Sequence, residues 1–383
     1  AFGGGLIERK HTILEERLFM KAVKLTGVKK LEVVDIETPA ADGVHPIMTV
    51  DTVGICGSDL HYWDDGDPLD LVMGHEFAGT IVDPGSRKDL KKGDRVFYIP
   101  SSACMECAAC KSGDTLACTN KVETPGIIDA SRIGAYAEMF KVKTAAHLYK
   151  IPDNISFEEA SMVEPSTVAY HGTALGGVKK GDTVLVTGAG LIGAMTIQWA
   201  KTLGASKVVF SEINEARSKA VLDMGYADTW LNEVPGVADL LKKYDDFTDN
   251  YMGQLMVAAQ LQEALGVPGG FDVVIDCSGN GAALNLGLGL LRPRGTVVWT
   301  GVRFHTFPMQ HALTIFRSAT IKAFLGTPIT EFDICRDAIF SGKYPVKQYQ
   351  TDSATLGTTQ AAFEKLSAPG NSQFKIMVYP QKG

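Results

Sequence analysis

A glycine-rich turn between an apolar strand and a helix limits the possible folds more than any other feature of this chain. Residues 183–187 have the pattern of a buried strand, and Gly188-Ala-Gly190-Leu-Ile-Gly193 follows them. The first glycine permits a tight turn, the second lets a pyrophosphate approach the backbone, and the third lets helix pack on strand. The free N–H groups of the helix favour a diphosphate. We therefore expect a dinucleotide site at these glycines, Leu191 and Ile192.

The segments around this turn alternate between strands and helices. Apolar strands are expected at 183–187, 207–211, 271–277 and 295–300, and helices at 191–203 and 214–224. Alternation of continuously apolar strands with helices predicts an α/β fold with a doubly wound parallel sheet covered on both faces. The stretch 237–265 is longer than one crossover needs, so one or two additional helices are expected there. A surface elaboration is the favoured interpretation of that insertion, ahead of a role in subunit contact or substrate access.

The residues after the second strand of this sheet bear on the choice of cofactor. Glu212 ends that strand nineteen residues after Gly193, where an acidic side chain binds the adenosine ribose hydroxyls and repels a 2′-phosphate. This predicts NAD over NADP. Arg217 is the counter-argument because it could neutralise that phosphate, but a solvated helix residue is the favoured interpretation of this arginine. Cys277 ends another strand and is expected in the core, beside the same cofactor-binding edge.

A second group of reactive side chains lies in the first half of the chain, where short segments punctuated by glycine and proline predict a mostly β domain. Cys56 precedes His75, in Gly74-His75-Glu76, by nineteen residues. A thiol, an imidazole and a carboxylate this far apart can meet only in a folded scaffold, and together they are typical of zinc. A reduced core cysteine beside a loop histidine is the alternative.

The neighbours of Cys56 fit the zinc hypothesis. Asp59 could accept a hydrogen bond from the non-ligating ring nitrogen of His75, which would fix its tautomer. Ser58 and His61 flank Asp59 and could pass a proton outward.

Four further cysteines have the spacing C-x2-C-x2-C-x7-C, at Cys104, Cys107, Cys110 and Cys118. Four thiolates around one zinc ion form a closed tetrahedral site that leaves no position for water or substrate. This pattern predicts a structural zinc lobe, with two disulfides or an iron–sulfur cluster as alternatives.

Composition excludes several classes of function. The chain has 37 basic and 44 acidic residues and a formal net charge of −7, so no electrostatic footprint for nucleic acid or an anionic membrane is expected. The partner is expected to be a small molecule. The apolar runs are too short to span a bilayer. The segment 1–19 lacks an apolar signal core and the cysteine count is odd, which together favour the cytoplasm.

With these motifs together, the chain resembles the zinc-containing medium-chain alcohol dehydrogenases from Met20 to its end. The resemblance rests on Cys56-Gly-Ser-Asp-Leu-His61, Gly74-His75-Glu76, the four cysteines, Glu164-Pro165 and the glycine motif. It implies a GroES-like catalytic domain over 20–169 with the zinc lobe at 100–120, a Rossmann domain over 170–323, and a return of 324–383 to the catalytic domain. It also implies one catalytic and one structural zinc per chain, NAD, and a homo-oligomer, either tetramer or dimer.

Within this family the chain is most similar to the polyol and threonine dehydrogenases. That similarity implies Cys56, His75 and Glu76 as zinc ligands, with Glu164 binding directly or through water. Ser58 and His61 match the proton relay, Tyr62 matches a substrate-pocket position, and Trp63 follows it. The chain departs from the polyol branch at 324–326, where Phe-Leu-Gly replaces a phenylalanine and arginine pair. The expected reaction is hydride transfer between NAD and a polyol, cyclitol or sugar-type alcohol. An amino-alcohol dehydrogenase acting on L-threonine and a non-catalytic NAD-binding protein are the alternatives.

Overall fold

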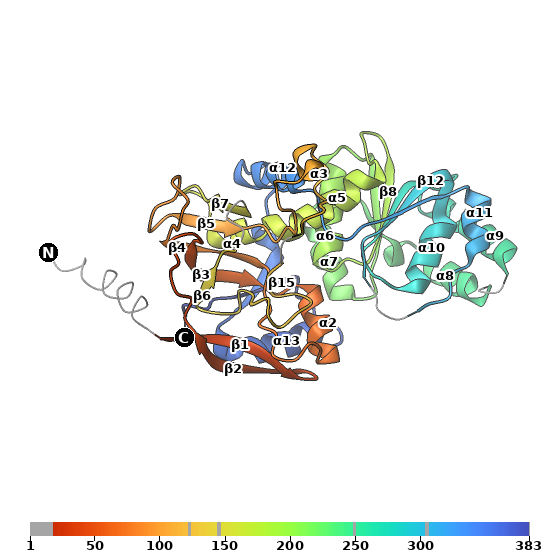
Figure 1. The fold of residues 1–383 in the computed structure, drawn as a ribbon. Coiled ribbons are helices and arrows are strands. Elements are labelled where there is room, and N and C mark those ends of the chain that lie inside the picture. The colour runs from red at the N-terminus through yellow and green to blue at the C-terminus, as the bar shows by residue number, and fades with distance from the viewer. Residues whose placement is uncertain (1–17, 122–123, 144–146, 248–249, 303–305, 383) are drawn as a thin grey trace. The chain divides into compact units, whose positions relative to one another are not determined.

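The computed structural model describes residues 18–121, 124–143, 147–247, 250–302 and 306–382. The chain divides into two compact units (Figure 1). Unit 1 comprises the described residues up to Met162 together with 350–367 and 375–382, and unit 2 comprises 163–349 and 368–374. Most of the segment 1–19, on which the expected absence of a secretory signal rests, lies outside the described residues.

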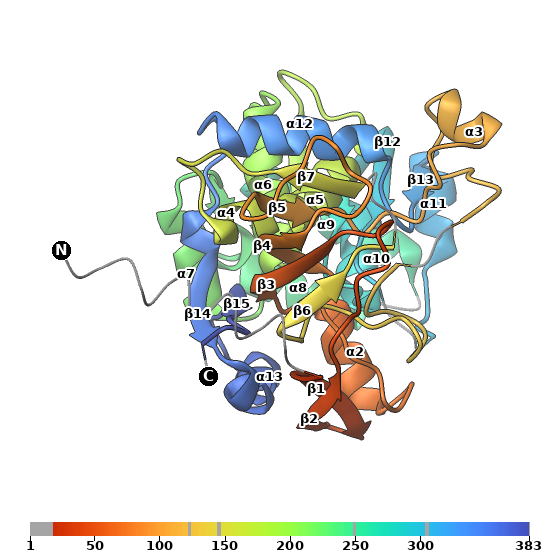
Figure 2. The same cartoon turned by 60° about the vertical axis from the view of Figure 1, so that its left-hand side comes forward.

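Unit 1 contains a two-stranded and a seven-stranded sheet. In the larger sheet the order is β14-β15-β3-β4-β5-β7, and β6 pairs with β3 (Figure 2). The strands of unit 1 are β1 (Phe19–Gly27), β2 (Lys30–Glu37), β3 (Ile47–Gly54), β4 (Glu76–Asp83), β5 (Arg95–Tyr98), β6 (Met139–Lys141), β7 (Leu148–Lys150), β14 (Gln350–Ala354) and β15 (Lys375–Val378). Its helices are α2 (Gly57–Asp65), α3 (Ala108–Lys111), α4 (Phe157–Ser161), α13 (Thr359–Ser367) and the 3₁₀ turn η4 (Leu356–Thr358). This mixture agrees with the predicted GroES-like, mostly β domain.

The register of three neighbouring strands brings distant residues to one edge of this sheet. Gly54, at the end of β3, pairs with Glu76 of β4 on one side and with Met377 of β15 on the other. The residues that follow β3 and those that begin β4 and β15 therefore lie close together. Apolar side chains such as Val53, Phe77 and Ile376 are fully buried along these strands and fix this register.

Unit 2 is built on a six-stranded parallel sheet with the order β10-β9-β8-β11-β12-β13. Its strands are β8 (Thr183–Thr187), β9 (Lys207–Ser211), β10 (Thr229–Trp230), β11 (Phe271–Asp276), β12 (Leu291–Trp299) and β13 (Thr320–Ala323). Its helices are α5 (Val163–Gly176), α6 (Leu191–Thr202), α7 (Glu215–Asp223), α8 (Val237–Asp246), α9 (Tyr251–Ala264), α10 (Gly281–Leu290), α11 (His311–Arg317) and α12 (Ile329–Phe340), with 3₁₀ turns η2 (Leu231–Glu233) and η3 (Lys347–Tyr349). The predicted doubly wound parallel sheet is confirmed.

Most of the predicted elements of unit 2 agree with the structure to within one or two residues at each end. The exception is β12, which begins at Leu291 rather than at residue 295. The predicted helices of the stretch 237–265 are α8 and α9. Among the described residues, none of the helices combines the length and apolar character needed to cross a membrane.

Helices α5 and α12 extend unit 2 beyond the residues expected for it. The indole Nε1 of Trp199 on α6 donates to the Ser166 carbonyl of α5 at 3.2 Å, and His171 Nδ1 of α5 lies 2.8 Å from Glu331 Oε2 of α12. These contacts join α5 to α6 and α12 to α5, and so connect both helices to unit 2. Unit 2 accordingly begins at Val163 and the chain returns to unit 1 at Gln350, compared with the expected positions 170 and 324.

Candidate metal centres and cofactor site

Three of the predicted zinc ligands converge at the edge of the unit 1 sheet. Cys56 precedes α2, His75 precedes β4, and Glu76 is the first residue of β4. One possible ligand atom from each residue lies within 4.8 Å of the other two. His75 is 7% exposed and Glu76 is 1% exposed. A thiolate, an imidazole and a carboxylate at such separations suit zinc, whose bonds to these atoms are about 2.0–2.3 Å long.

Asp59 lies on α2 next to these three predicted zinc ligands. Its Oδ2 accepts hydrogen bonds from the Cys56 backbone N–H at 3.0 Å and from the Tyr136 hydroxyl at 2.7 Å. Its Oδ1 lies 3.6 Å from His75 Nδ1, which is longer than a hydrogen bond. The carboxylate therefore faces the histidine as expected, but without the expected hydrogen-bond length. Burial raises the pKa of Asp59, against the opposing effects of His75, the Cys56 N–H and Tyr136.

Glu76 has a charged partner that its own sequence neighbourhood does not reveal. Lys375, the first residue of β15, donates from Nζ to the Glu76 carboxylate and to the Ile55 carbonyl at 2.7 Å. Both charged side chains are 1% exposed. A Cβ atom on Gly54 would approach Glu76 Oε2 to 2.6 Å, so glycine leaves room for this pair. The only signal in the sequence is a lysine inside an apolar strand, which is rare unless the charge is paired.

The predicted relay and substrate residues all lie on α2. The Ser58 hydroxyl is buried and has no hydrogen-bond partner in the part of the chain that the structure describes. Because buried hydroxyls are normally paired, this oxygen suits contact with a bound molecule. His61 and Tyr62 are partly exposed, and the Tyr62 hydroxyl accepts a hydrogen bond from the Ile128 N–H at 3.2 Å. Trp63 is 3% exposed and belongs to the core of unit 1, which accounts for it without a substrate.

The four predicted cysteines of the zinc lobe also come together. Their sulfur atoms lie within 4.8 Å of one another, and the Cys107 and Cys118 sulfurs are 3.9 Å apart. Tetrahedral zinc with bonds of about 2.3 Å would place two sulfurs about 3.8 Å apart. Backbone N–H groups point at the sulfurs: the Cys107 N–H donates to Cys104 Sγ at 3.3 Å. Hydrogen bonds from the Cys110 and Thr119 backbone lower the pKa of the Cys107 thiol, which favours the thiolate that a metal needs.

All seven cysteines of the chain are free. The two-disulfide alternative for the lobe is therefore not the arrangement that the structure adopts.

The glycine motif forms the turn between β8 and α6 in unit 2. Gly188 has φ 82°, and a Cβ atom on Gly193 would lie 1.9 Å from the Gly188 carbonyl oxygen, so both positions require glycine. Leu191 and Ile192 form the first turn of α6 and are partly exposed. The strand order reverses between β8 and β11, which is where dinucleotides bind in sheets of this kind.

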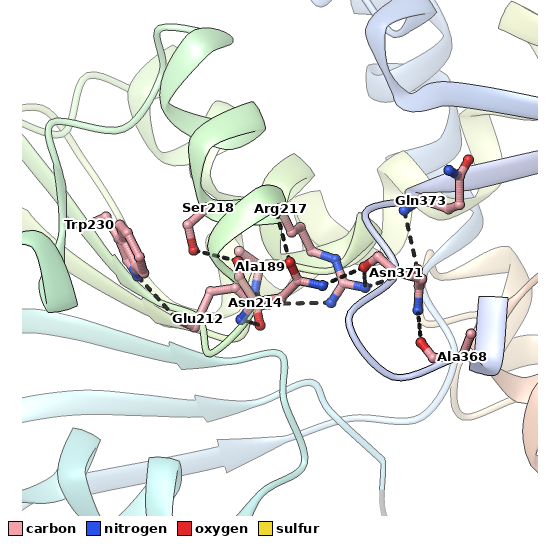
Figure 3. Close-up of polar contacts among 9 residues, drawn as sticks. All are labelled: Ala189, Glu212, Asn214, Arg217, Ser218, Trp230, Ala368, Asn371 and Gln373. Carbon is pink, nitrogen blue, oxygen red and sulfur yellow. Dashed lines mark hydrogen bonds and ion pairs between the residues drawn. The ribbon is translucent and has the colours of Figure 1, made fainter. Parts of the chain in front are cut away.

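Glu212 follows β9 and faces the same turn (Figure 3). Its Oε2 accepts the Ala189 N–H at 3.0 Å and its Oε1 accepts the Asn214 N–H at 2.9 Å. The Arg217 guanidinium lies 3.4 Å from Glu212 Oε2 and its side chain is 18% exposed. Arg217 is therefore not a solvated helix residue, contrary to the interpretation that its sequence position favours.

Two other predicted site residues lie in unit 2. Cys277 follows β11, its sulfur is 3.6 Å from the Thr196 hydroxyl of α6, and burial raises the pKa of its thiol to about 12. Its side chain contacts α6 and is partly exposed, so it stays a predicted cofactor-binding residue. Glu164 lies in the first turn of α5 and is partly buried. It stays a predicted zinc ligand.

Comparison with known proteins agrees with this arrangement. Residues 45–153 match the alcohol dehydrogenase GroES-like domain, and residues 192–338 match the zinc-binding dehydrogenase domain. The chain is 32% identical over 360 residues to "Probable D-xylulose reductase A" of Aspergillus clavatus, covering 90% of this chain and 92% of that protein. It is 28% identical to the sorbitol dehydrogenase of Bacillus subtilis, covering 97% and 99% of the two chains.

A solved structure described as a zinc-binding dehydrogenase from Sinorhizobium meliloti, bound to NADP, is also similar. Its TM-score is 0.78 at 26% identity, and the match covers 95% of this chain and 100% of that chain. The chain belongs to the zinc-containing medium-chain alcohol dehydrogenase family. It is an oxidoreductase of the alcohol and polyol dehydrogenase type, with zinc and a nicotinamide cofactor.

Proposed function

We propose that this enzyme oxidises a secondary alcohol of a polyol, cyclitol or sugar-type substrate with NAD, or reduces the corresponding ketone with NADH. The observation that carries the proposal is the convergence of Cys56, His75 and Glu76 at one buried point of unit 1. The names of the relatives, a xylulose reductase and a sorbitol dehydrogenase, support a polyhydroxylated substrate.

The proposed catalytic zinc site consists of Cys56, His75 and Glu76, with Glu164 as a further ligand that binds directly or through water. Zinc at such a site acts as a Lewis acid and makes a bound hydroxyl group far more acidic. The positive charge of Lys375 already compensates part of the negative charge of Glu76. The Glu76 carboxylate therefore neutralises a bound zinc ion less than a carboxylate without a lysine partner would. Asp59 positions Cys56 by accepting a hydrogen bond from its backbone N–H.

Ser58 and His61 are the proposed route for the proton that leaves the alcohol. The buried Ser58 hydroxyl, which has no partner among the described residues, is suited to accept a hydrogen bond from the substrate. His61 is three residues further along the same helix and partly exposed, so it is suited to exchange that proton with solvent. Tyr62 is proposed as a substrate-pocket residue.

The nicotinamide cofactor is proposed to be NAD, bound at the turn after β8 with its adenosine ribose beside Glu212. The carboxylate of Glu212 supports this choice because it would repel a 2′-phosphate. The four-cysteine lobe is proposed to hold a second, structural zinc. A cytoplasmic homo-oligomer, dimer or tetramer, stays part of the proposal.

One feature favours a substrate other than sorbitol. Leu325, which stands where polyol dehydrogenases carry an arginine, is 91% exposed and offers no cation to a substrate hydroxyl. An amino alcohol such as L-threonine is therefore the second candidate substrate.

A screen of NAD reduction tests the proposal. The purified protein would be offered polyols, cyclitols, sugars, secondary alcohols and L-threonine, with and without a zinc chelator. We expect chelator-sensitive NADH formation with one polyhydroxylated class. Turnover of L-threonine alone would select the second candidate. NADH binding without turnover of any alcohol would indicate a non-catalytic NAD-binding protein and overturn the proposal.

A further inference from the structure

A short segment near the C-terminus belongs to unit 2 although the chain on either side of it belongs to unit 1. This segment is 368–374, and it follows α13 and precedes β15. It contacts the residues that follow β9 at the proposed cofactor site (Figure 3). The Asn371 carbonyl accepts hydrogen bonds from Asn214 Nδ2 at 2.5 Å and from an Arg217 guanidinium nitrogen at 2.9 Å. The Asn371 side-chain oxygen lies 3.3 Å from the same nitrogen.

The Asn371 side chain also fixes the shape of this segment. Its Nδ2 donates to the Ala368 carbonyl at 3.0 Å, and its Oδ1 accepts the Gln373 backbone N–H at 3.2 Å. A side-chain amide that closes a turn on both sides holds the backbone between them. The carbonyl that receives Asn214 and Arg217 is thereby kept in place.

The other side of the Arg217 guanidinium faces Glu212. The contact is 3.4 Å long, and the two oxygens of Glu212 also accept the backbone N–H groups of Ala189 and Asn214. A continuous set of polar contacts therefore runs from the glycine turn through Glu212 and Arg217 to Asn371. One terminal nitrogen of the Arg217 guanidinium faces Glu212 and the other donates to Asn371.

An arginine five residues after the ribose-binding carboxylate would normally favour NADP. Guanidinium groups bind phosphate through paired, charge-assisted hydrogen bonds, and a nearby arginine accommodates the 2′-phosphate in NADP-binding relatives of this fold. Here the two terminal guanidinium nitrogens already contact Glu212 and Asn371, and only the buried Nε has no partner among the described residues. A 2′-phosphate would have to displace these contacts before it could bind the arginine.

We propose that Asn371 is a positioning residue for cofactor selection, which holds Arg217 away from the 2′ position and so enforces the NAD preference. The inference rests on the proposed NAD site at Glu212. It assigns a specificity role to a residue that is 154 positions away from the arginine in the sequence.

Two substitutions at this position are expected to act in opposite directions. Asn371→Ala removes the turn-closing amide and one acceptor, so Arg217 becomes available to a 2′-phosphate. We expect the ratio of the NADP to the NAD dissociation constant to fall roughly tenfold, the change expected for one charge-assisted hydrogen bond. Asn371→Asp adds a negative charge beside the guanidinium, and the ratio should rise. A merely structural role would move both variants in the same direction.

The measurement is titration of the full-length protein with each nucleotide by isothermal calorimetry, with melting temperatures as a check on folding. Ser372→Ala is the matched control because Ser372 is exposed in the same segment, and its ratio should equal that of the wild type. In the double variant Arg217→Ala, Asn371→Ala the gain in NADP affinity should disappear. A gain that survives without Arg217, or equal shifts in Asn371→Ala and Asn371→Asp, would overturn the inference.

The same titrations separate this inference from the proposed function. If the wild-type protein binds neither nucleotide, the proposed dehydrogenase function fails and the inference fails with it. If the wild type binds NAD but the ratio is unchanged in both Asn371 variants, only the role of Asn371 is rejected.

Discussion

The two cysteine-containing centres of unit 1 differ in the donors they offer and in what surrounds them. Cys56, His75 and Glu76 present sulfur, nitrogen and oxygen, beside a buried lysine and a buried serine hydroxyl without a partner among the described residues. The lobe presents four sulfurs, surrounded by its own backbone N–H groups. Three mixed donors leave room for a reacting molecule, whereas four thiolates complete the coordination of zinc. The difference predicts that one centre supports chemistry and the other supports the fold.

The largest expected effect is on turnover and belongs to the mixed centre. Cys56→Ser replaces the thiolate with a weak ligand, so the proposed catalytic zinc should be lost. We expect kcat/KM to fall by at least about a thousandfold, since a Lewis acid supplies several kcal/mol to such a transition state. The melting temperature should change little. Metal analysis should show one zinc per chain fewer than in the wild type, and unchanged turnover would show that this centre is not catalytic.

Lys375→Met tests the electrostatic balance of the same centre. It leaves the buried carboxylate of Glu76 without its partner, which typically costs about 3–5 kcal/mol of stability. Because a bound zinc ion would take over part of this compensation, the loss should be larger in chelator-treated protein than in zinc-loaded protein. Urea unfolding under both conditions measures the difference, and Lys382→Met, at an exposed position of the same segment, is the control. Equal losses with and without zinc would argue against metal binding at Glu76.

This lysine also shows where prediction from the sequence ends. The glycine turn, the parallel sheet and the four-cysteine lobe follow from local spacing, whereas Cys56, His75 and Glu76 were expected together from the family resemblance; in both groups the donor atoms do come together. Lys375 contacts Glu76 across 299 positions, and Tyr136 contacts Asp59 across 77. Such contacts depend on which strands become neighbours, and the position of β15 beside β3 is set by the tertiary fold. Local periodicity carries no information about it.

The division of the chain between the two units was hard to predict for a similar reason. The sequences of helices α5 and α12 do not indicate which of the two units each helix packs in. Their assignment to unit 2 depends on contacts such as Trp199 with Ser166 and His171 with Glu331. The role of Asn371 is likewise invisible in the sequence, because one seven-residue segment packs with a different unit from the chain around it.

Cys110→Ser makes the same change in the four-cysteine lobe that Cys56→Ser makes in the mixed centre, and it is expected to affect stability rather than turnover. It removes one of four thiolates from a site with few other buried contacts, since the cluster around it consists of the cysteines, Ala103 and Met105. We expect a loss of about 4 kcal/mol in unfolding free energy, in the range that loss of a metal site produces, and loss of one zinc per chain. At a temperature where the variant stays folded, kcat should be close to that of the wild type. A variant that keeps its stability but loses turnover would reverse the assignment of the two centres.

His147 lies next to the lobe and is expected to make the folding stability of unit 1 sensitive to acid. Its side chain is fully buried, its ring lies 6.1 Å from that of Tyr98, and its backbone carbonyl accepts the Ile99 N–H at 2.9 Å just before the lobe. Burial lowers the pKa of His147 from 6.5 to about 4. Between these values the unfolded chain binds a proton that the folded chain does not.

The stabilising contribution of neutral His147 is therefore complete above pH 6.5 and is lost as the pH falls towards 4. A shift of this size corresponds to about 3 kcal/mol. We expect His147→Gln, which carries no titrating group, to lose less stability than the wild type between pH 7 and pH 4 by about that amount. Urea unfolding at both pH values in the two proteins provides the measurement, and the difference between them cancels acid-induced zinc release common to both. Parallel loss in the two proteins would exclude His147 as a cause of acid sensitivity.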